Sequence, residues 1–327
     1  MSRPPLSVSV VICAYTQARW ADLSAAVASA LSQPDATEVI VVIDYEDALL
    51  ARATNALTGP RVRVVPNREK QGLSGARNTG VHESSSALVA FLDDDAEATA
   101  TWLGELVGCM SSDDIVGVGG RAEPRWPNGA APSTLPPELL WVVGCTYVGQ
   151  PTELSEVRNV IGCSMLFRRE RLLAVGGFNL NTGRIGSIPL GGEETELCIK
   201  LRQADPSARI LFQPLSIVNH RVSADRTTWR YLSRRSFFEG VSKSALSRDL
   251  GSDALSSERS YTTRVLPIGA IRQLAGGRPL GAAAIVLSLG AAAAGFVYGS
   301  LKVRRRSRDA LAVGNAATID LPSVINS

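Results

Sequence analysis

Three consecutive carboxylates, Asp93, Asp94 and Asp95, follow directly after the apolar run Ala87–Leu92. A run of this length and composition predicts a buried strand, and ligands of α/β proteins bind outside the carboxyl ends of such strands. Adjacent carboxylates repel one another unless a cation lies among them, and hard oxygen ligands suit Mg²⁺ or Mn²⁺. The sequence therefore predicts a metal site here, with a solvated acidic turn before the next helix as the alternative.

Asp44 stands at the end of a second apolar run, Glu38–Ile43. A carboxylate at that place can accept hydrogen bonds from a nucleobase or a ribose, or it can simply cap the next helix. The stretch Asn67–Gly80 is rich in small residues that allow close backbone approach, and its Arg77 offers a guanidinium suited to phosphate. This stretch has neither the Walker lysine pattern nor the G-x-G-x-x-G spacing.

The elements that must position these residues alternate between strands and helices. Apolar segments predict strands in the first half at Ser7–Ala14, Glu38–Ile43, Arg61–Val65 and before Asp93, and helical spacing predicts a helix over Ala21–Leu31. Such alternation implies a parallel, right-handed α/β sheet.

The second half continues this pattern less regularly. Further strands are predicted at Gly117–Arg121, Val160–Arg168 and Arg209–Val218, and a helix at Leu197–Gln203. The proline-rich segment Pro124–Pro137 has little periodicity, which is typical of an acceptor-binding loop and equally of a disordered insertion.

Four ordered segments together resemble those of family 2 glycosyltransferases with the GT-A fold: V-S-V-V-I-C-A-Y, E-V-I-V-V-I-D, N-x-x-x-x-G-x-x-x-A-R-N-x-G and F-L-D-D-D. Their order and spacing match over residues 7–240. The resemblance implies an α/β fold with a mainly parallel central sheet, a nucleotide-sugar donor, a D-x-D metal site and usually an inverting mechanism. One departure is that Ile43-Asp44-Tyr45 stands where many relatives have D-D-G-S.

The resemblance assigns roles to particular residues. Asp44 would contact the base, Asp93 would lie near the ribose or the metal, and Asp95 would ligate the metal. The candidates for donor binding are Ala14, Tyr15, Asp44, Gly72, Arg77, Asp93 and Asp94.

The segment Gly191–Leu197 carries Glu193, Glu194 and Glu196 at the start of a predicted helix. Acidic residues in a first helical turn are ordinary complements of the helix dipole. The segment also resembles the family's E-D-x-[DE]-L motif, whose second acid is the catalytic base, and Glu194 occupies that place with Glu instead of the commoner Asp. An inverting transfer needs such a carboxylate to deprotonate the acceptor hydroxyl.

His220, one of only two histidines, follows the strand Arg209–Val218. In several GT-A enzymes a histidine at this location completes the metal shell, so the resemblance implies Asp93, Asp95 and His220 as ligands of Mn²⁺ or Mg²⁺. A surface or capping histidine is the alternative. The other histidine, His82, is expected to be structural or exposed.

Arg226–Tyr231 resembles a degenerate form of the Q-x-x-R-W segment of processive relatives, but the Gln is missing, so no processive polymerase is inferred. With Arg234, Arg235, Phe237 and Phe238 it forms an aromatic and basic mixture. Such a mixture could hold a diphosphate or a lipid phosphate, or could form a helix on a membrane surface.

Composition limits the classes of protein. The chain has 327 residues, 45% of them hydrophobic, and a net charge of +3, which is too small to indicate a nucleic-acid partner. Its five cysteines stand singly without a regular spacing, which predicts free thiols in a reducing compartment. The N-terminus does not have the pattern of a secretory signal.

The uncharged stretch Leu280–Leu301 is long enough to span a bilayer, and basic residues flank it on both sides. Either it crosses the membrane against the stronger basic cluster, or it lies shallow or re-enters so that both ends stay cytosolic. Both options predict an association with the cell membrane, with the catalytic domain in the cytoplasm.

These observations predict a GT-A domain over residues 1–240, a helical or amphipathic linker over 241–279, a membrane segment over 280–301 and a basic, then disordered tail over 302–327. The predicted activity is metal-dependent, inverting glycosyl transfer from a nucleotide sugar to a glycan, glycolipid or lipid-linked hydroxyl; a homodimer is left open. The alternatives are a catalytically silent nucleotide-sugar-binding scaffold on the membrane and, less favoured, a nucleotidyltransferase, which would need a basic glycine-rich loop straight after the first strand.

Overall fold

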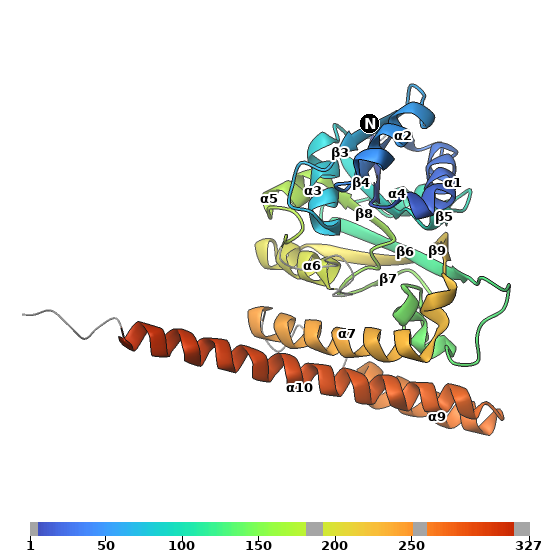
Figure 1. Ribbon diagram of the computed structural model, residues 1–327. Helices are drawn as coiled ribbons and strands as arrows, with labels where there is room; N and C mark the ends of the chain where they lie inside the picture. Colours follow the sequence, from blue (N-terminus) through green and yellow to red (C-terminus); the bar gives the residue numbers. More distant parts are fainter. Residues whose placement is uncertain (1–5, 181–191, 251–259, 317–327) are drawn as a thin grey trace, which may run out of the picture.

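The structure is a computed structural model that describes residues 6–180, 192–250 and 260–316. A nine-stranded sheet forms its centre, in the order β3-β2-β1-β4-β8-β6-β9-β5, with β7 paired to β9 (Figure 1). The strands are β1 (Val8–Ala14), β2 (Ala36–Ile43), β3 (Val62–Pro66), β4 (Leu88–Asp93), β5 (Ala96–Ala98), β6 (Ile115–Arg125), β7 (Ser155–Glu156), β8 (Ser164–Arg168) and β9 (Arg209–Arg221).

Helices cover both faces of this sheet. They are η1 (Gln17–Arg19), α1 (Trp20–Leu31), α2 (Asp47–Ala56), α3 (Leu73–Glu83), α4 (Trp102–Gly108), η2 (Pro137–Val143), α5 (Arg169–Ala174), α6 (Glu193–Ala204) and η3 (Ala224–Thr227). Successive strand residues point to opposite faces, so Val10 and Ile12 of β1 join the core under α1 and α4, while Val11 joins the core under α3 and α6. Burial on both faces explains why these strands are apolar throughout.

The sheet confirms the expected α/β class and differs in one respect from a purely parallel arrangement. β1, β2, β3 and β4 are parallel, but β8 runs antiparallel between β4 and β6, so that Phe91 pairs with Met165. β6 and β9 are then parallel to each other, and the sheet is mixed.

Some predicted boundaries move. The strand expected from Val160 begins at Ser164, because the preceding residues form a loop along the cavity described below. The helix expected from Leu197 begins at Glu193, so all three glutamates lie in its first turn. The proline-rich segment contains no helix or strand between Arg125 and Pro137, where η2 begins.

The C-terminal helices form a further layer against the sheet domain. α7 (Trp229–Leu250) lies between the domain and α10 (Pro279–Ala316), and the turn η5 (Tyr261–Val265) and α9 (Leu266–Ala275) lie beside α10 (Figure 1). Leu139 of η2, Leu232 of α7 and Ile285 of α10 share one apolar cluster, which joins this layer to the domain.

Two of the predicted segment boundaries can be compared with the C-terminal helices. The predicted boundary at residue 240 falls inside α7, which is one continuous helix. Helix α10 continues beyond the predicted membrane segment into the tail, which was predicted to be basic and then disordered, and ends at Ala316; residues 317–327 lie outside the described part of the chain.

Candidate active site

One cavity of about 1290 Å³ lies between the carboxyl ends of β1, β2 and β4 and the C-terminal helices. Every residue that the sequence marked for donor binding, metal binding or catalysis lines it: Ala14, Tyr15, Asp44, Gly72, Arg77, Asp93, Asp94, Asp95, Glu194 and His220. The fold thus brings the predicted set together from β1, β2, α3, β4, α6 and β9.

The acidic end of β4 and the end of β9 form a group that could hold a metal ion. Three potential ligand atoms lie within 4.8 Å of one another, one each from Asp93, Asp95 and His220. The strand register explains this, because β5 follows the acidic turn directly and its Ala96 pairs with His220. Two carboxylates and an imidazole fit the ligand chemistry of Mn²⁺, and the carboxylates also fit Mg²⁺.

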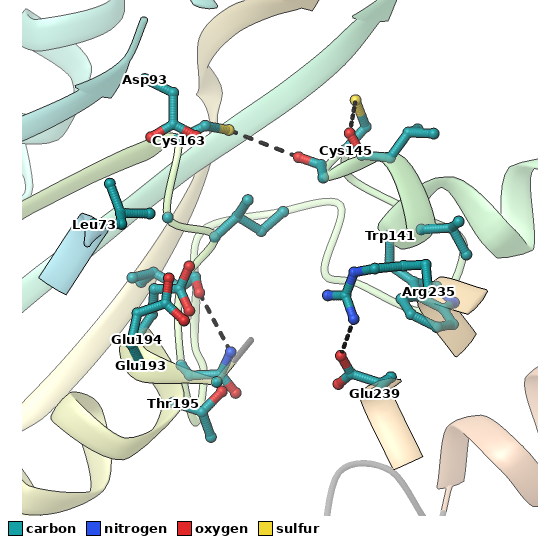
Figure 2. A pocket seen from close by; sticks show the side chains of 18 of the residues that line it. Leu73, Asp93, Trp141, Cys145, Cys163, Glu193, Glu194, Thr195, Arg235 and Glu239 are labelled. Atoms are coloured by element: carbon teal, nitrogen blue, oxygen red, sulfur yellow. Dashed lines mark hydrogen bonds and ion pairs between the residues drawn. The ribbon is translucent and has the colours of Figure 1, made fainter. Parts of the chain in front are cut away.

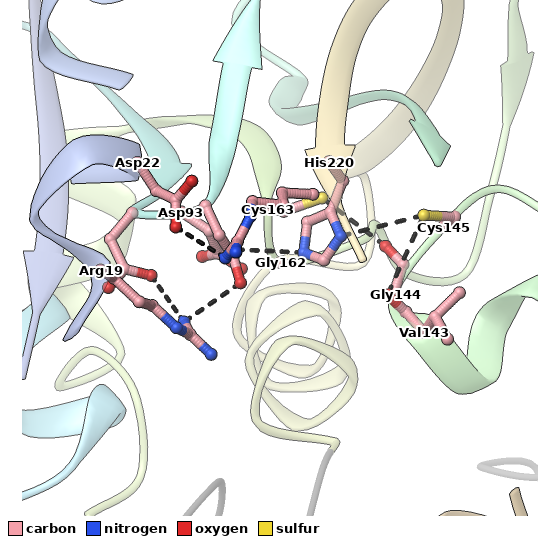
Figure 3. A network of polar contacts seen from close by, with 12 residues as sticks. Arg19, Asp22, Asp93, Val143, Gly144, Cys145, Gly162, Cys163 and His220 are labelled. Atoms are coloured by element: carbon pink, nitrogen blue, oxygen red, sulfur yellow. Dashed lines mark hydrogen bonds and ion pairs between the residues drawn. The ribbon is translucent and has the colours of Figure 1, made fainter. Parts of the chain in front are cut away.

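These ligands are held in a buried network of charges (Figure 3). His220 Nε2 lies 3.2 Å from Asp95 Oδ1, and its Nδ1 lies 3.9 Å from the sulfur of Cys145. Burial alone would lower the pKa of His220, but the Asp95 carboxylate raises it to about 10. Burial alone would raise the pKa of Asp95, but His220 and Arg19 hold it below its ordinary value.

Asp94 differs from its two neighbours. Its Oδ2 is buried without a hydrogen-bond partner, and burial together with the Asp95 charge raises its pKa to about 7, although Arg19 opposes this. Its Oδ1 accepts a hydrogen bond of 2.9 Å from Arg19 Nη1. Asp94 therefore faces Arg19 and does not belong to the group that could hold a metal ion.

Two arginines at this site have no part in the predicted set. Arg19 of η1 lies 3.1 Å from Asp95, and Arg226 of η3 lies 3.6 Å from the same carboxylate. Arg226 belongs to the degenerate basic motif noted above, whereas Arg19 stands in no motif. The only sequence signal for Arg19 is its place shortly after the first strand.

Asp44 anchors the glycine-rich stretch. Its carboxylate accepts hydrogen bonds from the backbone N–H of Gly72 at 3.0 Å and from Asn67 Nδ2 at 2.6 Å. Gly72 has φ 129°, a value that glycine adopts without strain. Next to Asp44, Tyr45 has φ 53° and donates its hydroxyl to the Glu69 carbonyl.

Arg77 connects the metal end of the cavity to α6. Its buried guanidinium lies 3.4 Å from Asp93 and 3.3 Å from Glu193, and it donates a 3.2 Å hydrogen bond to the Gly162 carbonyl. It lines the cavity as predicted, but these contacts direct its charge toward protein carboxylates. Arg77 therefore also organises the acidic groups around it.

Glu194 is the more accessible of the two glutamates that begin α6. Its side chain is 19% exposed and lies 4.0 Å from Arg77, whereas that of Glu193 is 5% exposed and paired with Arg77. Burial and the neighbouring Glu193 charge raise the pKa of Glu194 to about 8, although Arg77 opposes them. A carboxylate with a raised pKa is suited to accept a proton near neutral pH.

The wall opposite these glutamates belongs to the C-terminal helices (Figure 2). Arg235 of α7 lies 2.7 Å from Glu239, which also contacts Lys243. The guanidinium of Arg235 lies 5.5 Å from the ring centre of Trp141. Leu289, Ala292 and Phe296 of α10 line the same cavity, so it has a charged end near β4 and a partly apolar far wall.

Comparisons with known proteins agree with this geometry. Residues 9–175 match the family model "Glycosyl transferase family 2". The glucosyl-dolichyl phosphate glucuronosyltransferase of Haloferax volcanii is 33% identical over 241 residues, which cover 73% of this chain and 76% of that protein. The succinoglycan biosynthesis protein ExoM of Rhizobium meliloti is 27% identical over 253 residues, 73% of this chain and 75% of that protein.

A solved structure supports the fold. The mannosyltransferase PcManGT of Pyrobaculum calidifontis, in complex with GDP-Man and Mn²⁺, superposes with a TM-score of 0.61 at 16% identity, over 90% of this chain and 87% of that one. The sequence comparisons favour glycosyl transfer over nucleotidyl transfer and over a silent scaffold, and the structural match supports the GT-A fold.

Proposed function

Because this chain belongs to glycosyltransferase family 2, we propose that it is a metal-dependent, inverting enzyme that transfers a sugar from a nucleotide-sugar donor to the hydroxyl of a lipid-linked acceptor. The observation that carries the proposal is the grouping of Asp93, Asp95 and His220 in the cavity that Glu194 also lines.

The donor occupies the end of the cavity nearest β1 and β2. Asp44 holds the backbone of Gly72 in place and, with Ala14 and Tyr15, borders the space for the base and ribose. Asp93, Asp95 and His220 would hold Mn²⁺ or Mg²⁺, which supplies positive charge to the donor diphosphate. Arg19 and Arg226, both within 4 Å of Asp95, bring further positive charge to this end.

Glu194 is the general base of the proposed reaction. Its carboxylate takes the proton of the acceptor hydroxyl as that oxygen attacks the anomeric carbon from the side opposite the nucleotide. Arg77 and Gly162 fix the position of this carboxylate: a Cβ atom at residue 162 would lie 2.2 Å from Glu194 Oε1.

The acceptor enters from the opposite end, which is bounded by α7 and α10. This wall combines the charged groups of Arg235 and Lys243 with the apolar side chains of Leu289 and Phe296, as an anionic lipid carrier requires. The name of the Haloferax relative, which specifies a dolichyl phosphate, supports a lipid-linked acceptor. An apolar helix at Pro279–Leu301 supports a place at the membrane, and a nucleotide-sugar donor supports its cytoplasmic face.

Donor hydrolysis by the purified full chain tests the proposal. A panel of nucleoside diphosphate sugars is incubated with Mn²⁺, with Mg²⁺ and with EDTA, for the wild type and for Asp95→Asn. We expect release of nucleoside diphosphate that EDTA stops and that Asp95→Asn lowers at least 100-fold. Asp113→Asn, whose side chain is 70% exposed on the surface, is the matched control. Hydrolysis that survives both EDTA and Asp95→Asn would contradict the metal-dependent mechanism.

A further inference from the structure

Helix α10 has two different faces. Residues spaced three and four apart are buried or half-buried: Gly281, Ile285, Ser288, Ala292, Gly295 and Gly299. The opposite face exposes apolar side chains, among them Val286, Leu287, Val297 and Leu301. Only 33% of the most apolar stretch within the segment Pro279–Leu301 is buried within the protein.

The buried face of α10 packs against α7 at backbone distance. Ser236 and Ser288 are joined by a hydrogen bond of 2.8 Å. A Cβ atom at Gly240 would lie 2.0 Å from the Ala292 carbonyl oxygen. At Gly295 it would lie 1.9 Å from that of Phe237. Glycine at these positions brings the two helices together over several turns, so α10 cannot be oriented in a membrane independently of α7.

Helix α7 is unsuited to a bilayer interior. It carries charged residues along the length that packs on α10, namely Arg230, Arg234, Arg235, Glu239 and Lys243. If α10 crossed the membrane, α7 would enter the hydrocarbon beside it, where each charge is costly. In addition, Leu289 and Phe296 line the active-site cavity, so this side of α10 faces the cavity and not the bilayer.

A second groove, of about 710 Å³, lies between the same helices. Arg230 and Arg234 border it from α7, and Val286, Leu287 and Gly290 border it from α10. Cationic groups beside an apolar floor match a lipid whose phosphate lies next to its acyl chains. The exposed apolar residues of the adjoining α9, Ile268, Ile271 and Leu274, extend the apolar surface.

We propose that α9 and α10 lie in the plane of the membrane surface and do not cross it. Their exposed apolar side chains enter the boundary between headgroups and acyl chains, and Arg230 and Arg234 contact anionic headgroups. This proposal rests on the membrane location given under the proposed function and specifies how the chain meets the bilayer. It also places the active-site cavity beside the headgroups, behind the α7–α10 wall.

Membrane topology provides the first test. The full chain carries a protease-cleavable epitope at each terminus, and protease is added to sealed inverted vesicles and to intact spheroplasts. We expect both epitopes to be cleaved only in inverted vesicles. Cleavage of the two epitopes from opposite sides would show that α10 crosses the membrane and would overturn the proposal.

Vesicle binding provides the second test. Purified full chain is mixed with phosphatidylcholine vesicles that contain or lack phosphatidylglycerol. Arg230→Gln/Arg234→Gln should lower the affinity for the anionic vesicles roughly 30-fold, about fivefold for each charge. Arg63→Gln/Arg68→Gln on the far edge of the sheet, at β3, is the matched control and should bind as the wild type does.

Thermal unfolding of both double variants, compared with that of the wild type, serves as the test of correct folding. An unchanged affinity of Arg230→Gln/Arg234→Gln for anionic vesicles would overturn the headgroup contact. Neither assay needs sugar transfer, so failure of the membrane proposal and failure of the proposed enzymatic function are distinguishable.

Discussion

At the scale of single residues, Glu193 and Glu194 have adjacent positions and different surroundings. Glu193 is paired with Arg77, while Glu194 is more accessible from the cavity and has the raised pKa. This difference favours Glu194 as the base, in agreement with the motif. The sequence alone could place the acidic pair at a helix start but could not show which member Arg77 binds, because Arg77 lies far away in the chain.

Glu194→Gln keeps the size of the side chain and removes its ability to take a proton. We expect kcat to fall by roughly two to four orders of magnitude while donor affinity is kept, since the base contacts the acceptor. Glu194→Asp should retain more activity than Glu194→Gln. Single-turnover transfer and donor titration measure the two effects. If Glu194→Gln turns over normally and Glu193→Gln is inactive, the general base is Glu193 and not Glu194.

The raised pKa of Glu194 predicts a pH dependence. The base acts as a carboxylate, so kcat should rise as the pH increases through about 8 and then level off.

The stability of the fold follows the opposite trend. A carboxyl whose pKa rises from 4.5 to about 8 on folding contributes stability below pH 4.5 that is lost as the pH rises to about 8. The Tm of Glu194→Gln relative to that of the wild type should therefore increase between about pH 4.5 and pH 8 and then level off. A constant difference in Tm between pH 5 and 9 would contradict this.

Gly162 lies in the segment Val160–Arg168, which was predicted as a strand, but it was not among the predicted site residues. A Cβ atom there would lie 2.2 Å from Glu194 Oε1 and 2.7 Å from Arg77 Nη2. We expect Gly162→Ala to displace the base and to lower kcat at least tenfold, because small misplacements of catalytic groups are costly. Gly108→Ala, where a Cβ meets no atom within 4 Å, is the control and should leave kcat unchanged. Equal activities of the two variants would show that Glu194 is not fixed by this contact.

At the scale of elements, the strands that carry the donor site were predictable because each is a short apolar run ending in a polar residue. β8 was predicted as a strand, but its antiparallel direction was not, since alternation and apolar content do not encode direction. The contact of Asp95 with His220 depends on the pairing of β5, a strand of only three residues, with β9. No sequence pattern of that length specifies such a pairing.

The close packing of α10 on α7 can be tested by substituting two glycines of α10. Gly295→Ala would place a methyl group 1.9 Å from the Phe237 carbonyl oxygen, so we expect the helices to separate and Tm to fall by several degrees. At Gly290 a Cβ meets no atom within 4 Å, so Gly290→Ala should raise stability by up to about 1 kcal/mol through helix propensity. Differential scanning calorimetry of the full chain measures both. If Gly295→Ala is as stable as Gly290→Ala, the backbones of α7 and α10 are not in close contact at Gly295.

At the scale of the whole molecule, the C-terminal helices line the candidate active-site cavity and also carry the surface of the proposed membrane contact. Hydropathy marked Leu280–Leu301 as an apolar segment but could not show which of its faces packs on protein. Ala284 and Ile285 belong to an apolar cluster with residues of η2 and α7, and Phe296 lines the active-site cavity.

Truncation before Leu280 should therefore have two effects. The protein should move from the membrane fraction to the soluble fraction, because the apolar segment is lost. It should also lose transfer to lipid-linked acceptors, because one wall of the cavity is removed. Fractionation and transfer assays measure these effects. A truncated protein that stays in the membrane fraction would assign the anchor to α7 or to a partner.

The pairing of β5 with β9 also has a consequence for the order of folding. During synthesis, β1 to β4 emerge and can form their parallel pairs while β9 is still unmade, and non-local pairings of this kind form slowly. Asp95 can therefore contact His220 only after β9 has been synthesised, when almost the whole catalytic part has left the ribosome. If Asp93, Asp95 and His220 hold a divalent cation as proposed, the cation would stabilise the chain only from that step onward, so its presence during refolding should favour the final docking of β9 over the earlier steps.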